Sequence, residues 1–447
     1  MIPYIESLTK KARERGIKRL HFHIEDIQKR DLSIFGGAVE HTGASHETLV
    51  LVEGEYKGFI GSSYAEDWDE KGIPVLTENI IQTAEQNSIA YVEKPIFDMP
   101  VPDTAIIPFY LHNISEELLA AEKAAKAANS KLRTIRLDVS RHQKTVTLMD
   151  GEGRSMKDQS CFLSVMIDAM AKDGDKVQTA FTGRLFPAKP DFSSLAIDTA
   201  SEACLMLTSK PCTSGNYSAV IANGAFAELF GAFLPAFYAE KCQGKMSFMA
   251  AKLGKTIASQ AFSAYEDPFS LNCRRFDDEG TQTTGKFIIE KGQLCVYFHN
   301  TQTAAKDTAG NNAQKSNGNG FRQYYKENIS SAYTNVYVEA GQRNLNELLF
   351  EMGDGLLITA CDGIFAGVNP VSGDFSVISK GFMIRNGRLC EPVSGITIGG
   401  NLITMLAAVE ETGNDTAVVQ SNTGIVGSGS LRLSNIIVSG KSKAQNA

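Results

Sequence analysis

Alternation of apolar and polar residues predicts strands in the first part of the chain. Leu20, Phe22 and Ile24 alternate with polar residues, as in a strand with one buried face. A short amphipathic helix is predicted over Ile5–Arg15, and a second helix over Leu76–Gln86. Two further strand-like runs, separated by turn residues, lie between these helices at Thr48–Val52 and Tyr56–Gly61.

A second cycle of the same order begins at Ser115. Ser115–Leu118 has the composition of a capped helix start, and an alanine-rich helix continues to Ala128. Another helix is predicted over Ser193–Thr208, and the proline-marked stretch Pro95–Pro108 is expected to be an extended connector. The strands expected between the two helices are Thr134–Val139, Lys144–Met149, Cys161–Ala169 and Lys176–Arg184. We interpret segments 1–95 and 109–212 as two related α/β parts.

The pattern changes at Gly215. One apolar helix, predicted over Ala225–Tyr238, precedes a glycine-rich region of short strands joined by glycine turns. The polar stretch Thr301–Gly320 is predicted to be a mobile surface loop, and deletion of Thr303–Asn319 is expected to leave thermal stability nearly unchanged. The chain is therefore expected to be α+β. An N-terminal α/β region of helices and strand meanders precedes a mainly antiparallel β domain with one apolar helix, residues 215–440.

Composition narrows the class of protein. Hydrophobic residues make up 43% of the chain and charged residues 21%, as in ordinary globular proteins, and the net charge is −7. Such an acidic surface repels phosphate backbones, so we expect no nucleic-acid partner. No apolar run is long enough for a bilayer, so we expect no membrane attachment. The eight cysteines lack CxxC spacing, which indicates free thiols in the cytoplasm.

Candidate metal ligands are few. The chain has seven histidines, and no two of them have HExxH or HExxxH spacing. His21 and His23 share one face of a predicted strand, where a partly exposed pair is expected rather than a metal site. In the apolar helix, the run Ala227-Glu228-Leu229-Phe230-Gly231-Ala232 is, from the residues alone, core packing.

The acidic run Asp277-Asp278-Glu279 is the most specific polar motif outside that helix. Three carboxylates before Gly280 can order a turn by accepting backbone N–H bonds, or can bind a cation. The ordered turn is the preferred interpretation.

Together these segments resemble the TldD/PmbA family, also called modulators of DNA gyrase. The resemblance also rests on five C-terminal motifs: Tyr265–Pro268, Arg275–Gly280, Gly367–Phe375, Ile396–Leu402 and Gly413–Asp415. In the family's catalytic branch the helix has the sequence HExxxH, and a cysteine in a late glycine-rich loop completes the zinc site. Here Ala227 and Ala232 replace both histidines, only Glu228 remains, and the loop Ser421–Gly427 has no cysteine. The resemblance implies the PmbA/TldE branch, which carries no metal.

Helix geometry adds a condition to that resemblance. Residues five apart on a regular helix point about 140° away from each other. An HExxxH zinc site therefore needs a distorted turn, such as a π-bulge, and Gly231 is a residue that would permit one.

The resemblance also implies a function. It predicts the non-catalytic subunit of a two-component cytoplasmic zinc metallopeptidase acting on peptides or unfolded proteins. The subunit would form a homodimer, or a heterodimer with a zinc-bearing TldD-like homologue that holds the only zinc. Asn369, Asn401 and the Thr301–Gly320 loop are candidates for a substrate cleft, although asparagine beside glycine or proline more often orders a turn. The alternatives are an independent metallopeptidase with other ligands and a non-enzymatic peptide-binding protein.

Overall fold

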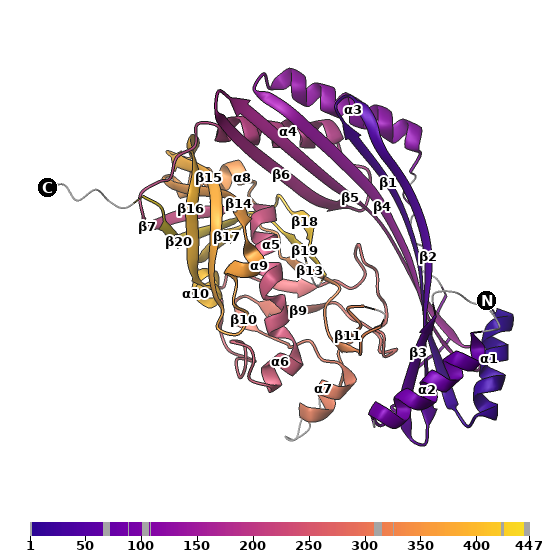
Figure 1. Cartoon of the computed structure of the whole chain (residues 1–447). Helices are drawn as coiled ribbons and strands as arrows, with labels where there is room; N and C mark the ends of the chain where they lie inside the picture. The colour runs from indigo at the N-terminus through magenta and orange to yellow at the C-terminus, as the bar shows by residue number, and fades with distance from the viewer. Residues whose placement is uncertain are drawn as a thin grey trace.

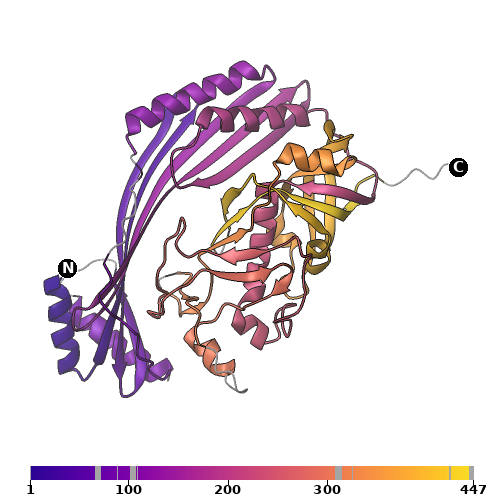
Figure 2. The same ribbon diagram turned by 180° about the vertical axis from the view of Figure 1, so that it is seen from behind.

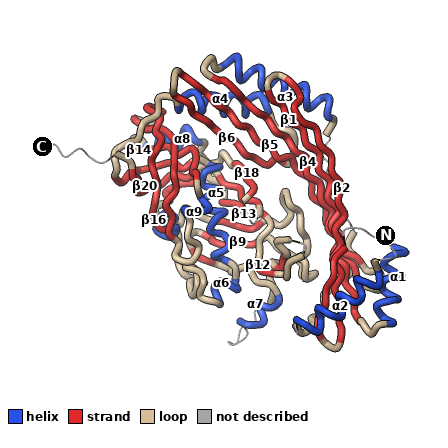
Figure 3. The backbone as a smooth tube through the Cα atoms, in the orientation of Figure 1, coloured by secondary structure: helices blue, strands red, loops and turns tan. Residues whose placement is uncertain are grey.

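The computed structural model describes residues 2–65, 72–87, 89–100, 107, 109–307, 315–324, 326–421 and 424–441. Helices and mainly antiparallel sheets confirm the predicted α+β class (Figures 1 and 3). Within the described residues, no helix is both long and apolar enough to cross a bilayer.

One long six-stranded antiparallel sheet dominates the N-terminal half. Its order is β3-β2-β1-β4-β5-β6, and β1 pairs with β4 from His21 to Phe35. The sequence segments 1–95 and 109–212 therefore share one sheet. Its strands are β1 (Lys18–Phe35), β2 (Ala38–Tyr56), β3 (Phe59–Ala65), β4 (Leu132–Asp150), β5 (Ser155–Asp173) and β6 (Lys176–Phe186).

The observed strands are longer than the sequence predicted. Thr134–Val139 and Lys144–Met149, predicted as two strands, are one continuous strand, β4. The polar residues between them interrupt the apolar alternation, but the backbone there pairs with β1 on one side and β5 on the other. Hydrogen bonds along both edges keep this stretch extended without an apolar face.

Four helices cover the outer face of this sheet (Figures 1 and 2). Leu20, Phe22 and Ile24 of β1 point outward and pack in a buried cluster with α1 and α2. Because side chains alternate along a strand, His21 and His23 point inward, toward the C-terminal region. The helices are α1 (Ile2–Glu14) and α2 (Ile73–Asn87) at one end, and α3 (Leu111–Ala128) and α4 (Phe192–Met206) at the other.

The C-terminal region contains two larger sheets. In the first, β16-β15-β14-β7-β20-β17, strand β16 also pairs with β20, so five strands close into a ring. Most pairs are antiparallel, but β7 with β14 and β13 with β19 are parallel. The first sheet contains β7 (Gly215–Ile221), β14 (Gly355–Asp362), β15 (Asp374–Arg385), β16 (Arg388–Asn401), β17 (Val409–Thr412) and β20 (Leu431–Ser439). The second contains β8 (Ala264–Glu266), β9 (Lys286–Glu290), β10 (Gln293–Leu294), β13 (Asn335–Val338), β18 (Ala417–Gln420) and β19 (Ile425–Ser428).

Short elements complete this region. A two-stranded sheet pairs β11 with β12. The remaining elements are α6 (Ala239–Gln243), α7 (Thr301–Lys306), β11 (Gly320–Phe321), β12 (Ser330–Ser331), α8 (Leu345–Met352), α9 (Ile364–Gly367) and α10 (Leu402–Ala407).

The apolar helix α5 (Asn223–Phe233) lies at the centre of this region (Figure 1). Phe226 and Phe230 stack on one another with ring centroids 5.7 Å apart inside the main core. The predicted single helix Ala225–Tyr238 is wrong at its end, because α5 gives way to a 3₁₀ turn at Leu234–Phe237. Pro235 lacks the N–H that an α-helix would use there, so it ends the regular helix.

The prediction of one mobile loop over Thr301–Gly320 is also wrong. Thr301 begins helix α7, which Asn300 caps, and Thr303 is buried. Asn319 is fully buried and donates to the Glu266 carboxylate at 2.9 and 3.1 Å. Residues 308–314 lie outside the described part of the chain. Removal of Thr303–Asn319 would expose the buried partners of these residues. The deletion is therefore expected to lower stability, contrary to the sequence-based prediction.

Candidate functional site

The degenerate helix α5 carries Ala227, Glu228 and Ala232 in a packed environment. Ala227 is fully buried and touches the main core, whereas Ala232 and Glu228 are partly buried. The helix is α-helical throughout Asn223–Phe233, so the distorted turn considered at Gly231 is absent from this chain's α5.

Gly231 has a different role, which is close packing. A Cβ at this position would lie 2.8 Å from the Cβ of Ser421 and 3.2 Å from a methyl of Val426. Ser421 in turn hydrogen-bonds Tyr333 through its hydroxyl, at 2.7 Å. Helix α5 and the segment leading into β19 are therefore in direct contact. Asn422 and Thr423 of this segment lie outside the described residues.

Glu228 has an arginine as its charged neighbour. Burial raises the pKa of Glu228, and the nearby Arg184 guanidinium partly opposes this rise. Arg184 comes from β6 of the long sheet, and a Cβ at Gly224 would clash with its guanidinium. The surviving glutamate thus lies where α5 meets the N-terminal sheet. Sequence reasoning missed Arg184, because only the fold brings β6 to this helix.

The acidic turn accepts several backbone N–H bonds. Asp277 accepts from Glu279 at 3.0 Å, from Thr281 at 2.9 Å and from Gly320 at 2.9 Å. Burial, together with the Glu279 carboxylate, raises the pKa of Asp277 to about 8. Glu279 accepts from both the N–H and the hydroxyl of Thr301 at 2.7 Å. These contacts order the turn and join it to α7 and β11.

Asp278 connects this turn to the long sheet. Its carboxylate is paired with Arg274, accepts the Arg322 N–H at 2.8 Å and lies 3.7 Å from Nδ1 of His23 in β1. The Arg274 guanidinium foremost, with the Arg322 N–H bond, holds the pKa of Asp278 far below its usual range in spite of burial.

A second buried carboxylate, Glu53 of β2, continues the network. It pairs with Lys94 and Arg322, and the Lys94 ammonium also donates to the Asp278 carbonyl at 3.1 Å. Glu53 is buried, but Lys94 and Arg322 lower its pKa to about 2. We call Glu53, Lys94, Arg274, Asp278 and Arg322 the interface network, because they join the long sheet to the C-terminal region.

His21 and His23 are not the partly exposed pair that the sequence predicted. They are 7% and 5% exposed, because Tyr91 packs against His21 and Asp278 of the acidic turn reaches His23. His21 bonds the Tyr91 hydroxyl at 2.6 Å, and His23 contacts Glu25 at 3.1 Å. Within the described residues, no three His, Cys, Asp or Glu side chains gather as a metal-ligand group.

Asn369 and Asn401 meet at one turn beside β15. Asn369 accepts the N–H of Val371 at 2.9 Å, and Asn401 caps α10 by accepting the N–H of Ile403 at 3.1 Å. Asn401 also donates to the Ser372 carbonyl at 3.1 Å. Both amides are therefore engaged in ordering the turn, the use that the sequence analysis gave as the alternative to a place in a cleft.

Comparisons with known proteins identify relatives of this chain. Residues 214–440 match the model of the PmbA/TldA metallopeptidase C-terminal domain. Metalloprotease PmbA of Escherichia coli O157:H7 is 28% identical over 221 residues, covering 49% of this chain and 45% of that protein. A PmbA homologue of Buchnera aphidicola subsp. Baizongia pistaciae is 30% identical over 246 residues, covering 54% and 50% respectively. The chain thus spans about half the length of these two relatives.

Solved structures share the whole fold. TldE from Thermococcus kodakarensis has a TM-score of 0.83 at 19% identity, covering 98% of this chain and all of that one (100%). A Thermotoga maritima protein described as a modulator of a DNA gyrase has a TM-score of 0.83 at 23% identity, covering 98% and 99%. The family model matched by residues 214–440 is that of a metallopeptidase family. The chain belongs to the PmbA/TldD family.

One prediction concerns the packing of α5. Replacing Ala227 by histidine should lower the free energy of unfolding by about 1–3 kcal/mol, because a fully buried methyl leaves no room for a ring. Ala232→His, at a partly exposed position, should cost less. Urea denaturation of both variants measures the difference. An Ala227→His variant as stable as the wild type would reveal space that the packing described above does not contain.

Proposed function

We propose that this chain is the non-catalytic, PmbA/TldE-type subunit of a two-component zinc metallopeptidase of the cytoplasm. Its partner would be a zinc-bearing TldD-like homologue, and its substrates peptides or unfolded proteins. The observation that carries the proposal is the absence of zinc ligands from helix α5. Ala227 and Ala232 cannot donate a lone pair to zinc, and Ser421, which contacts Gly231, introduces no thiolate.

The outer surface of the five-stranded ring supports a role in assembly. Ile378 of β15 and Ile437 of β20 are 57% and 53% exposed, although both lie on strands paired with β16. Their pairing positions, Thr397 and Gly399, are two residues apart on β16, so the two side chains belong to one area of the sheet. Exposed apolar side chains grouped on a sheet favour contact with another protein.

Substrate selection would follow from backbone recognition. Unfolded chains present free main-chain N–H and C=O groups, which a strand edge binds without requiring a particular sequence. Folded proteins have these groups already paired. We therefore expect the assembled pair to cleave disordered peptides and to leave folded proteins intact.

A reconstitution experiment tests the proposal. The purified chain is mixed with a zinc-bearing TldD-like homologue. Light scattering measures complex formation, and a disordered fluorogenic peptide serves as the substrate whose hydrolysis is measured. We expect a complex, and hydrolysis that requires both chains. A compact folded protein is the control substrate. Peptide hydrolysis by this chain alone would support the independent peptidase instead, and the absence of any complex would remove the two-component assembly.

A further inference from the structure

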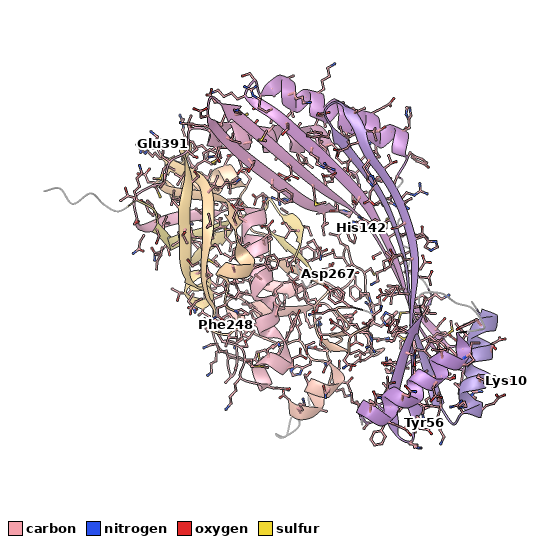
Figure 4. The ribbon with its side chains drawn as sticks, viewed as in Figure 1. Lys10, Tyr56, His142, Phe248, Asp267 and Glu391 are labelled. Carbon is pink, nitrogen blue, oxygen red and sulfur yellow. The ribbon has the colours of Figure 1, made fainter. Side chains whose placement is uncertain are left out.

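A half-open cavity of about 110 Å³ lies at the end of the long sheet that carries α1. It forms where α1 meets the start of β1 and the turn between β4 and β5, and it includes Arg13, Arg19 and Arg154. Figure 4 shows Lys10 of α1 at this end of the molecule, far from Phe248 in the C-terminal region. None of the residues that line the cavity belongs to α5.

The three arginines come from three different elements and line one small space. Arg13 is exposed, and its side chain forms no hydrogen bond or ion pair with any described residue. Arg19 is only loosely paired, with Glu55 at 3.6 Å and Glu93 at 3.4 Å. The guanidinium groups of Arg13 and Arg19 therefore have N–H donors available for a ligand.

Three carboxylates, Glu93, Asp150 and Glu152, line the cavity beside the three arginines. Asp150 is buried and already engaged, because it accepts from Nε of Arg154 at 2.6 Å and from two backbone N–H groups at 3.0 Å. The side chains of Glu93 and Glu152 are 66% and 70% exposed, so water screens them.

The backbone at Arg19 is strained. Its φ is +50°, a left-handed conformation that non-glycine residues rarely adopt. The strain falls at a register shift between Lys18 and His21, where the pairing of β1 with β2 is irregular. Bulges of this kind redirect a side chain, and here the redirected side chain lines the cavity.

Two buried polar atoms at the cavity lack partners. Thr9 and His21 are 6% and 7% exposed, and neither Oγ1 of Thr9 nor Nδ1 of His21 has a hydrogen bond within the described structure. His21 uses its other ring nitrogen on Tyr91. Buried polar groups without partners are rare in folded proteins and commonly mark the place of a water or a ligand.

We propose that this cavity binds a small oxyanion, a phosphate or carboxylate group, held by Arg13, Arg19 and Arg154. Planar guanidinium groups match both kinds of oxyanion through paired N–H donors. The enclosed volume limits the ligand to a small molecule or to one anionic group of a larger one. Occupancy would give the free donors of Arg13 and Arg19 a partner.

Titration calorimetry on the full chain tests this site with two probes, inorganic phosphate and succinate, at constant ionic strength. Arg13→Gln should weaken binding by about tenfold, the loss expected for one charge-assisted hydrogen bond. Because the Arg13 side chain has no partner among the described residues, the substitution leaves no orphaned carboxylate. Arg133→Gln is the matched control, since Arg133 is an exposed arginine on β4 outside the cavity. It should bind like the wild type.

Each outcome decides a point. Phosphate binding alone assigns a phosphate ligand, and succinate binding alone assigns a carboxylate. Equal weakening by Arg13→Gln and Arg133→Gln would show general attraction to positive charge and overturn the site. Absence of heat with both probes would also overturn it. None of these results depends on zinc or on a partner subunit, so the outcome is independent of the proposed peptidase role.

Discussion

Replacing Asp278 by alanine is expected to lower the free energy of unfolding by about 3–5 kcal/mol, the usual cost of breaking a buried ion pair from one side. Asp278 is 2% exposed and Arg274, its principal partner, 6%. Without the carboxylate, the Arg274 guanidinium would remain buried and lose its counter-charge. The backbone N–H of Arg322 would lose its acceptor as well. Urea denaturation at neutral pH measures the effect.

The matched control is Asp173→Ala. Asp173 pairs with Lys131 at 2.7 Å, but both side chains are about half exposed, so little change in stability is expected. Asp278→Asn, which keeps one acceptor oxygen, should fall between the two. Equal stabilities for Asp278→Ala and Asp173→Ala would contradict the view that the interface network joins the two regions.

Acid should weaken the protein through Glu53. Its pKa falls from 4.5 in the unfolded chain to about 2 in the folded protein. A carboxyl with a lowered pKa contributes stability above its unfolded pKa, and that contribution is lost as the pH falls from 4.5 to 2. The contribution is about 3 kcal/mol. His21 acts in the same direction, because burial lowers its pKa from 6.5 to about 4. As the pH falls from 6.5 to 4, the unfolded chain takes up a proton at His21 before the folded protein does, so stability falls.

Denaturation at a series of pH values separates Glu53 from other groups. Glu53→Gln should be less stable than the wild type at neutral pH, and the two stability curves should approach one another below pH 4.5. Glu93→Gln, at an exposed side chain, should keep the wild-type pH dependence. Parallel curves for the wild type and Glu53→Gln would show that the Glu53 charge does not contribute as described.

Periodicity located the elements but misjudged their ends. The apolar alternation at Leu20–Ile24 correctly marked β1, yet the strand extends to Phe35 through a polar middle. Hydrogen bonding to β2 and β4 holds that middle extended, and this pairing leaves no trace in the local pattern. For α5 the opposite happened, because the apolar pattern continued past Pro235 although the helix did not.

The candidate site was only partly accessible from the sequence. The three carboxylates of Asp277–Glu279 were conspicuous because they are adjacent. Their partners were not, since Lys94 lies 184 positions from Asp278, and Glu53 lies 269 positions from Arg322. Such a network has no spacing rule, and only the docking of the long sheet onto the C-terminal region creates it. The oxyanion cavity was missed for the same reason.

Zinc content is the most direct test of the central claim, that this chain is the metal-free member of a metallopeptidase pair. Elemental analysis is carried out on the purified chain alone, on the zinc-bearing homologue, and on the assembled pair. We expect no tightly held zinc in this chain and one zinc per pair, lost when the homologue's histidine ligands are replaced. One equivalent of zinc in this chain alone, released by Glu228→Gln, would contradict the account.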